Sequence, residues 1–130
     1  MMSGYVNANR EAIIQIAITG DNKRPKSVRA IIDTGFTGDL TLPRNVIDEL
    51  GFTLRGLQRV ILGDGSLQYF EMFVGSVIWD GQMRQVEINA AETDSLVGMG
   101  LLENYKLEME GRPGGEVRIT PLSASRSITV

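Results

Sequence analysis

Short apolar runs, separated by glycines and polar turns, make up most of this chain, and long stretches with helical periodicity are scarce. Residues 11–18 (EAIIQIAI) and 27–33 (SVRAIID) each predict a strand, because β-branched apolar residues favour extended backbone. A third short strand is expected at 39–42. Pro43 suits the first turn of a helix over 43–50, and Gly51 is well placed to end it.

Short strands resume after this helix, and two of the turns between them contain Asp-Gly. Residues 58–62 and 66–74 predict a hairpin around Gly63-Asp64-Gly65, because Asp-Gly favours the positive φ angles of such turns. This pattern predicts an all-β domain with one or two short helices. The remaining expected elements are a hairpin of strands 76–79 and 83–89 around Asp80-Gly81, a short strand at 95–97, a helix at 100–105, and a last hairpin of strands 106–110 and 116–121.

Length and composition fit one such domain. The chain has 130 residues, of which 42% are hydrophobic, and this is enough for a single apolar core. Its 15 glycines exceed the average share of about 7%, as expected for many tight turns. No linker divides the sequence, so we expect one domain over residues 10–121, with an N-terminal extension at 1–9 and a mobile tail at 122–130.

Charge and missing residue types exclude several kinds of function. The chain has 13 basic and 16 acidic residues, so it offers no basic face for nucleic acid. It has no cysteine and no histidine, which removes disulfides, thiolate nucleophiles, Ser-His-Asp triads and Cys- or His-based metal sites. No apolar window approaches the length of a membrane span, and no signal peptide is visible. We therefore expect a cytoplasmic protein with no membrane partner.

The residues with the clearest chemical character are Asp33, Thr34 and Gly35, at the end of the second predicted strand. The strand brings the Asp33 carboxylate to the edge of the core, where partial shielding from water can move its pKa. Gly35 and Gly38 favour a turn, and Thr34 places a hydroxyl beside the acid. An Asp at this place also commonly accepts hydrogen bonds from the next backbone amides, so the tripeptide alone leaves a catalytic and a structural interpretation open.

Four features in order along the chain resemble the retropepsin-like aspartic proteases, the single-domain relatives of pepsin. They are the strand leading into Asp33-Thr34-Gly35, the segment 39–43 (DLTLP), the hairpin around Gly63-Asp64-Gly65-Ser66, and Leu96-Val97-Gly98 followed by Leu101-Leu102. The resemblance covers about residues 10–121. It implies an acid-protease barrel of one lobe, in which Gly63, Asp64, Gly65 and Ser66 form a flap over the substrate.

The resemblance also implies an aspartic endopeptidase that hydrolyses peptide bonds by direct attack of water, with no metal and no cofactor. This chemistry needs two carboxylates that share one proton, and the chain has one Asp-Thr-Gly. The second acid must then come from a second copy, so that Asp33 of each chain meets its equivalent at the two-fold axis of a homodimer. Thr34, Gly35 and Gly98 are expected to support this dyad. The expected partners are a second copy of the chain and a peptide or protein substrate.

Two positions depart from the family's pattern. Phe36 stands where many relatives carry Ser or Ala, and Gly100 stands where they often carry Asp or Asn. These departures keep open a second interpretation, a catalytically inactive peptide-binding or dimerisation module with the same fold. A third interpretation is a divalent-metal site of Asp33, Asp64 and Asp94, because hard cations take carboxylate oxygens, although nothing in the sequence fixes these three together.

Overall fold

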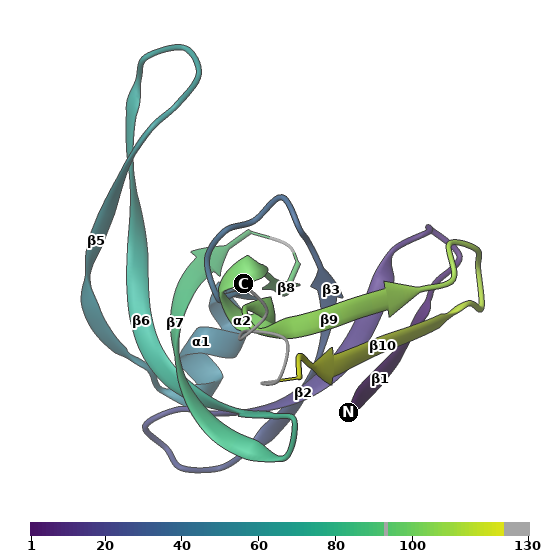
Figure 1. Ribbon diagram of the computed structural model, residues 1–130. Coiled ribbons are helices and arrows are strands. Elements are labelled where there is room, and N and C mark those ends of the chain that lie inside the picture. Colours follow the sequence, from purple (N-terminus) through teal and green to yellow (C-terminus); the bar gives the residue numbers. More distant parts are fainter. Residues whose placement is uncertain (93, 124–130) are drawn as a thin grey trace.

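The computed structural model describes residues 1–92 and 94–123, which form ten strands and two short helices (Figure 1). The strands join one mixed sheet in the order β5-β6-β7-β4-β8-β3-β2-β1-β10-β9, so the expected all-β class is confirmed. In chain order the elements are β1 (Met2–Val6), β2 (Ala12–Thr19), β3 (Lys26–Ile32), β4 (Leu40–Pro43), α1 (Arg44–Leu50), β5 (Thr53–Ile61), β6 (Leu67–Trp79), β7 (Gln82–Ala91), β8 (Leu96–Val97), α2 (Met99–Leu102), β9 (Tyr105–Met109) and β10 (Glu116–Pro121).

A closed barrel lies at the centre of this sheet. β6 pairs with β7 along one edge and with β2 along the other, so β6, β7, β4, β8, β3 and β2 form a ring. β6 reaches both partners because its 13 residues extend beyond β5: Val74 pairs with Thr53 of β5, and Ser76 already pairs with Thr19 of β2. Closure gives these strands partners on both sides and encloses an apolar interior.

The interior of the barrel is filled by aliphatic side chains. β2 shows the pattern, because Ile14, Ile16 and Ile18 are buried whereas Gln15 between them is exposed. Burial of each such side chain contributes about 1.5–3 kcal/mol relative to exposure. The largest fully buried side chains are Trp79, Ile14, Ile18, Leu40, Leu42, Ile47, Leu50, Ile88, Leu101 and Ile119.

Helix α1 packs on the barrel through Ile47 and Leu50, both buried. Pro43 precedes the helix rather than opening it, because its ψ of 152° is extended. Gly51 ends the helix as expected: it adopts the left-handed conformation, with φ of +70°, and its N–H donates to the carbonyl of Ile47 at 3.0 Å. Glycine adopts this conformation at no steric cost.

The separate strands predicted at 66–74 and 76–79 are one strand in the structure. Gly75 pairs with Val86 inside the continuous ladder between β6 and β7, so the glycine does not interrupt the strand. It serves close packing instead, since a Cβ at this position would overlap the ring of Phe52. A glycine in an apolar run therefore marked a close contact here and not a turn.

The helix predicted at 100–105 is shorter in the structure and begins one residue earlier, as α2. It ends before Asn104, whose φ of +68° leaves the helical region. Tyr105 then starts β9, and its ring lies edge-on to that of Trp79 with centroids 5.9 Å apart. This contact ties β9 to the barrel.

The sequence places residues 1–9 outside the domain, whereas the structure includes most of them in the sheet. β1 pairs with β10 over Met2 to Tyr5, and its last residues, Tyr5 and Val6, also pair with β2. Of the tail expected at 122–130, only residues 122 and 123 lie within the described part of the chain.

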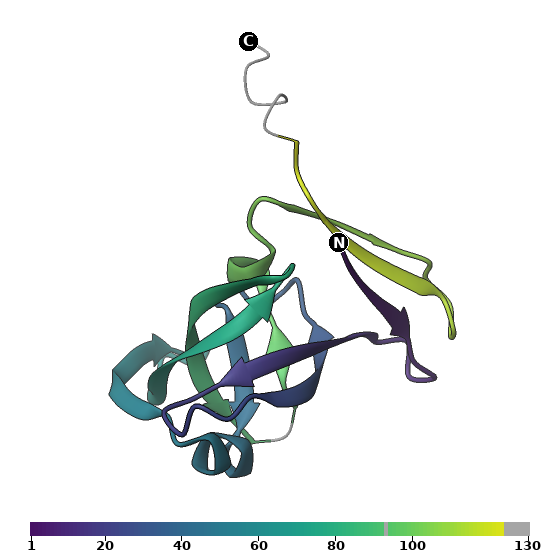
Figure 2. The same ribbon diagram turned by 90° about the horizontal axis from the view of Figure 1, so that it is seen from below.

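Two arms extend from the barrel. The hairpin of β5 and the first half of β6 projects from one side (Figure 1), and β1, β10 and β9 form a three-stranded terminal arm on the other (Figures 1 and 2). Neither helix within residues 1–92 and 94–123 has the length and apolarity needed to cross a membrane.

Candidate active site

Asp33 directly follows β3, where that strand leaves the barrel. Its backbone N–H donates to the carbonyl of Val97 at 2.9 Å, because β3 and β8 are parallel and end side by side. Its Oδ1 accepts the N–H of Gly35 at 2.9 Å, and its carbonyl accepts the N–H of Phe36 at 3.1 Å. The other carboxylate oxygen, Oδ2, accepts no hydrogen bond from the described residues. The tight turn therefore fixes the half-buried acid and leaves one oxygen open.

The loop of residues 33–39 crosses over the end of β8. The crossing follows from strand order: β8 lies between β3 and β4, so the chain leaves β3 on one side of β8 and returns along β4 on the other. Gly98 lies under the crossing and is buried. A Cβ on Gly98 would overlap the carbonyl oxygen of Gly38 and would lie 2.7 Å from that of Phe36. No side chain fits at residue 98 without moving the loop.

Helix α2 is hydrogen-bonded to this same loop. The first amides of a helix have no partner within it, so they need acceptors from elsewhere. Here the acceptors are loop carbonyls, and the loop and α2 form one bonded unit behind the Asp33 turn. The three bonds, of 2.8 to 3.0 Å, run from Gly98 to Asp39, from Met99 to Phe36, and from Gly100 to Gly38.

Phe36, the first departure from the family's pattern, packs on two glycines. A Cβ at Gly38 would lie 2.7 Å from the Phe36 ring, and one at Gly98 would lie 2.5 Å from it. The ring is half-buried, and its bulk is accommodated because neither neighbour has a side chain. The aromatic ring thus adds packing between the loop and the start of α2.

Gly100, the second departure, faces the carboxylate of Asp39. A Cβ at Gly100 would overlap Asp39 Oδ1. The other oxygen, Oδ2, accepts the N–H of Glu87 in β7 at 3.0 Å. Asp39 therefore occupies the space beside Gly100 and ties the loop to β7.

Arg84 holds the other end of α2. From β7 its guanidinium donates to the carbonyl of Gly100 at 2.9 Å and to that of Leu101 at 3.2 Å. These are carbonyls at the C-terminal end of a helix, where a positive charge is favourable. The half-buried Arg84 thus connects β7 to α2, and α2 connects to the Asp33 loop.

Thr34 and the four predicted flap residues are exposed. The Thr34 hydroxyl has no hydrogen-bond partner among the described residues. At the tip of the β5–β6 hairpin, Asp64 Oδ1 accepts the backbone N–H of Ser66 at 2.9 Å and its hydroxyl at 2.6 Å. Both bonds, the hydroxyl first, lower the pKa of the exposed Asp64 carboxyl below its ordinary value of 3.8. Gly65 next to it adopts a φ of +86°.

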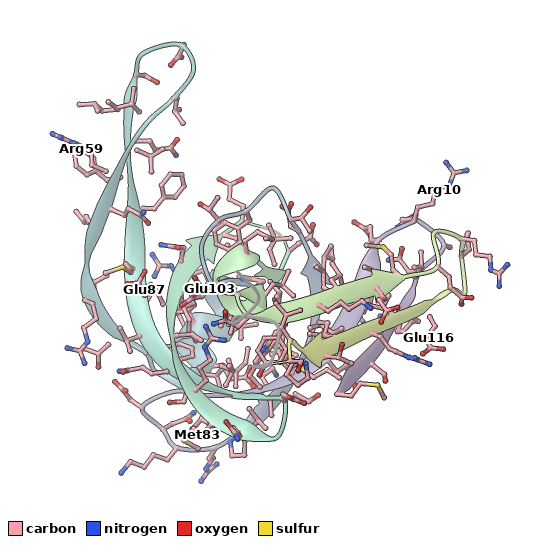
Figure 3. All side chains as sticks on the ribbon, viewed as in Figure 1. Arg10, Arg59, Met83, Glu87, Glu103 and Glu116 are labelled. Atoms are coloured by element: carbon pink, nitrogen blue, oxygen red, sulfur yellow. The ribbon has the colours of Figure 1, made fainter. Side chains whose placement is uncertain are left out.

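The hairpin behind this tip carries an exposed apolar patch. One face of this hairpin carries the side chains of Leu57, Ile61, Leu67 and Tyr69. In β5, Leu57, Arg59 and Ile61 lie on the same face because they are alternate residues of a strand. Across the ladder, Tyr69 lies opposite Arg59 and Leu67 lies opposite Ile61, so both share that face. Each of the four is 54–70% exposed. Arg59 on this face points away from the barrel (Figure 3). Such a patch on an arm indicates a surface that contacts another molecule.

The three aspartates of the alternative metal site are not brought together. Asp33 lies at the barrel end, Asp64 lies at the tip of the hairpin, and Asp94 precedes β8. Within the described residues, no group of three or more acidic side chains is placed to hold a metal ion.

Comparison with known proteins supports the fold. No family model and no curated protein matches the sequence. Among solved structures, the chain is similar to a retropepsin-like aspartic protease from Rickettsia conorii, with a TM-score of 0.59 and 19% identity, over 94% of this chain and 91% of that one. The chain therefore has the retropepsin-like fold, as the sequence predicted, and the similar structure is that of an aspartic protease.

Sequence reasoning missed three residues around the Asp33 loop. Asp39 gave no local signal, because its contact with α2 depends on how the loop crosses β8. Arg84 gave no signal in the sequence, because a charged residue in a polar strand segment is common. Thr41 is buried, and its hydroxyl donates to the carbonyl of Asp94 at 3.1 Å and accepts the N–H of Leu96 at 2.9 Å, which fixes the start of β8.

Proposed function

We propose that the protein is an aspartic endopeptidase that acts as a homodimer, with Asp33 of each subunit forming the catalytic dyad. The observation that carries this proposal is the position of Asp33, fixed by a turn at the end of a barrel strand of a retropepsin-like fold with one carboxylate oxygen open. One chain supplies only one Asp-Thr-Gly, so the dyad requires a second copy.

The dyad works because two neighbouring carboxylates cannot both be ionised near neutral pH. At a separation of about 3 Å, their repulsion is roughly 5 kcal/mol at an effective dielectric constant of 20. The pair therefore keeps one proton. The ionised Asp33 accepts a proton from the attacking water, the protonated one donates to the carbonyl oxygen of the peptide bond, and a tetrahedral diol forms. Proton transfer to the leaving nitrogen then breaks the C–N bond.

Other residues have supporting roles in this proposal. Thr34 is exposed and its hydroxyl is unpaired in the described part of the chain, so it is available to hydrogen-bond the partner's backbone. Gly35 and Gly98 keep the turn compact enough for two copies to approach. Gly63, Asp64, Gly65 and Ser66 form the tip that closes over an extended peptide, and closure excludes water from the dyad.

The test is cleavage of an unstructured protein between pH 4 and 6. We expect cleavage by the native sequence, loss of at least 10³-fold in Asp33→Asn because both carboxylates of the dyad are then replaced by amides, and no effect of a chelator. Asp48→Asn is the matched control, since Asp48 lies exposed on α1 and makes no ion pair or side-chain hydrogen bond with the residues that the structure describes. Cleavage that survives Asp33→Asn contradicts the proposal.

The second candidate is a peptide-binding module without activity. The apolar patch of Leu57, Ile61, Leu67 and Tyr69 favours it, because such a patch binds peptide whether or not cleavage follows. Peptide binding by the native sequence at every pH from 4 to 6, without any cleavage, identifies this alternative.

A further inference from the structure

The outward face of β6 and β7 forms the floor of a surface groove. Alternate residues of the two strands point away from the barrel, whereas the residues between them, such as Val77, are buried inside it. The outward residues lie opposite each other in three cross-strand pairs: Val74 with Glu87, Ser76 with Gln85, and Ile78 with Met83. Figure 3 shows Glu87 and Met83 at the two ends of this part of β7.

Two adjoining hollows over this floor make up the groove. Their volumes are about 670 and 680 Å³, which is within the range of ligand sites, and Arg55, Val74 and Gln85 line both. The first hollow reaches Asp39, the last residue of the loop of residues 33–39. The second lies between the strands and the loop of residues 20–25. From Val74 to Ile78 the floor is about 13 Å long, enough for about five extended residues.

A β-bulge directs Arg55 toward the middle of the groove. Leu54 of β5 pairs with Phe73 of β6. The next pair is Gly56 with Met72, which leaves Arg55 as the extra residue of the ladder. A bulge of this kind re-aims a side chain out of the regular alternation of its strand. Because Arg55 lines both hollows, the bulge places a positive charge where they join.

The wall formed by the loop of residues 20–25 carries a second positive charge, that of Lys23. Lys23 has a φ of +61°, a conformation that costs a residue with a side chain about 1–2 kcal/mol. The loop is held to helix α1, because the N–H of Asn22 donates to the carbonyl of Leu50 at 3.3 Å and its side chain donates to that of Glu49 at 2.9 Å. The wall is therefore fixed, and Lys23 lines the groove.

Three charged side chains of the groove have no ionic partner in the part of the chain that the structure describes. They are Glu87, Arg55 and Lys23, and all three are exposed. The carboxylates of Asp21 and Asp39 also line the groove, and each already accepts a hydrogen bond from another residue. Along the groove the free charge is thus negative at Glu87 and positive at Arg55 and Lys23.

The end of the groove near the β6–β7 turn is apolar. Ile78 is 40% exposed and Met83 is 70% exposed, and Pro25 lines the same hollow. Covering apolar surface of this kind releases water and favours binding. This end therefore favours an apolar side chain of a ligand.

We propose that the groove is an exosite, a surface outside the site of cleavage where an extended segment of the substrate binds. The substrate's role here rests on the proposed function. The segment carries a basic side chain beside Glu87, an acidic one beside Arg55, and an apolar one over Ile78 and Met83. Alternate residues of an extended peptide lie on one face about 6.6 Å apart, which is also the spacing of the three cross-strand pairs.

An extended peptide fits this groove better than a small anion does. Only an elongated ligand meets the negative charge at Glu87, the positive charge at Arg55 and the apolar end at the same time. The groove also begins at Asp39, where the loop that carries Asp33 ends. A chain that leaves the site of cleavage along this side of the subunit is therefore close to the groove.

Binding is tested apart from cleavage, with the Asp33→Asn protein. The probes are the blocked peptide Lys-Ser-Glu-Ser-Leu and its reverse, Leu-Ser-Glu-Ser-Lys, since the central Glu lies beside Arg55 in either direction. We expect one of them to shift the amide NMR signals of the groove residues Ser76, Ile78, Met83 and Gln85. Replacement of the central Glu by Lys should weaken binding at least about fivefold, because an attraction becomes a repulsion.

Charge reversal in the protein gives the complementary test. Arg55→Glu should weaken binding of the peptide with the central Glu at least about fivefold, and it should favour the peptide with the central Lys. Arg29→Glu is the matched control, because Arg29 is exposed on β3 and does not line the groove. Its affinity for both peptides should equal that of the protein without this change.

The role in cleavage is tested with a peptide that the native protein cleaves, made with and without the five-residue segment. A spacer of about ten Gly and Ser residues, with a root-mean-square length of about 17 Å, joins the two parts. The segment should lower KM at least about fivefold and leave kcat unchanged, because it binds equally in the ground and transition states. Arg55→Glu should remove this gain and leave the kinetics of the unextended peptide unchanged.

The outcomes separate the exosite from the proposed function. Peptide binding in the groove that Arg55→Glu weakens and Arg29→Glu does not supports the site, even where the native protein cleaves nothing. No shift at about 5 mM peptide, or equal binding of the central Glu and Lys peptides, overturns it. Hexanoate that binds the groove as tightly as the peptide identifies a small anion and also overturns it. Cleavage that depends on Asp33 but gains nothing from the segment leaves the function standing and removes the exosite.

Discussion

The carboxylate of Asp39 occupies the volume that any side chain at residue 100 would need. Its Oδ1 stands where a Cβ of Gly100 would lie, while its Oδ2 accepts the N–H of Glu87. The absence of a polar side chain at Gly100 is therefore matched by an acid across the interface between the loop and α2.

The fit between these residues predicts an energetic coupling. Gly100→Ala is expected to destabilise the fold by about 1–3 kcal/mol through overpacking. Asp39→Ser removes the overlapping carboxylate oxygen, so the same Gly100→Ala change should cost less in that background, by at least about 0.5 kcal/mol. Urea unfolding of the four proteins measures the difference. Gly111→Ala is the control, because a Cβ there meets nothing within 4 Å. If the losses in free energy of unfolding caused by Gly100→Ala and Asp39→Ser simply add, the carboxylate of Asp39 does not limit the space at residue 100.

Gly98 is expected to tolerate substitution less well, because backbone surrounds it. Gly98→Ala should destabilise the fold by about 1–3 kcal/mol or more, since the Cβ would meet the carbonyl oxygens of Gly38 and Phe36. Phe36→Ala removes the ring and leaves both oxygens in place, so it should relieve only part of this cost. Gly56→Ala serves as the comparison, with open space around its Cβ. Equal unfolding midpoints for the Gly98 and Gly56 variants would argue against this explanation.

Arg84 is expected to stabilise the end of α2. Arg84→Met removes two charge-assisted hydrogen bonds to helix carbonyls and should cost about 1.5–3 kcal/mol, while faster amide exchange in α2 localises the effect. Arg84→Lys keeps the charge and should retain part of the stability. Arg59→Met, on the exposed hairpin, is the control for loss of an arginine (Figure 3). If Arg84→Met and Arg59→Met lower the free energy of unfolding equally, the hydrogen bonds from Arg84 to α2 do not explain the loss.

The hairpin tip should keep its conformation throughout the pH range of the cleavage assay. Asp64 has a pKa below 3.8, so its ionised form stabilises the tip above that value, and the contribution is lost only as the pH falls below 3.8. Carbon-detected NMR titration of the carboxyl group should give a midpoint below 3.8, and Ser66→Ala should raise it. Ser3→Ala, on β1, should leave it unchanged. A midpoint that Ser66→Ala does not move contradicts the assigned cause.

Local signals predicted the elements whose causes are local. The helix before Gly51 and the hairpin around Asp64-Gly65 follow from turn chemistry, and a run of β-branched apolar residues identifies β2. The break predicted at Gly75 was wrong, and the helix predicted at 100–105 was too long, because the causes lie elsewhere in the fold: the ring of Phe52 beside Gly75, and the pairing of Tyr105 in β9. β1 was left outside the domain because its partner, β10, is more than a hundred residues away.

The sequence by itself determined the class of fold and the acid at the end of the second barrel strand, because alternation, turn residues and the Asp-Thr-Gly tripeptide act over a few neighbouring positions. Only the tertiary structure decided how that acid is supported. β8 pairs in parallel with β3 on one side and antiparallel with β4 on the other, so the loop between β3 and β4 must cross β8. The crossing brings Asp39, Arg84 and Gly98 together around α2. These residues are brought together by the order of the strands in the sheet and lie far apart along the chain, so no local sequence pattern predicts their contact.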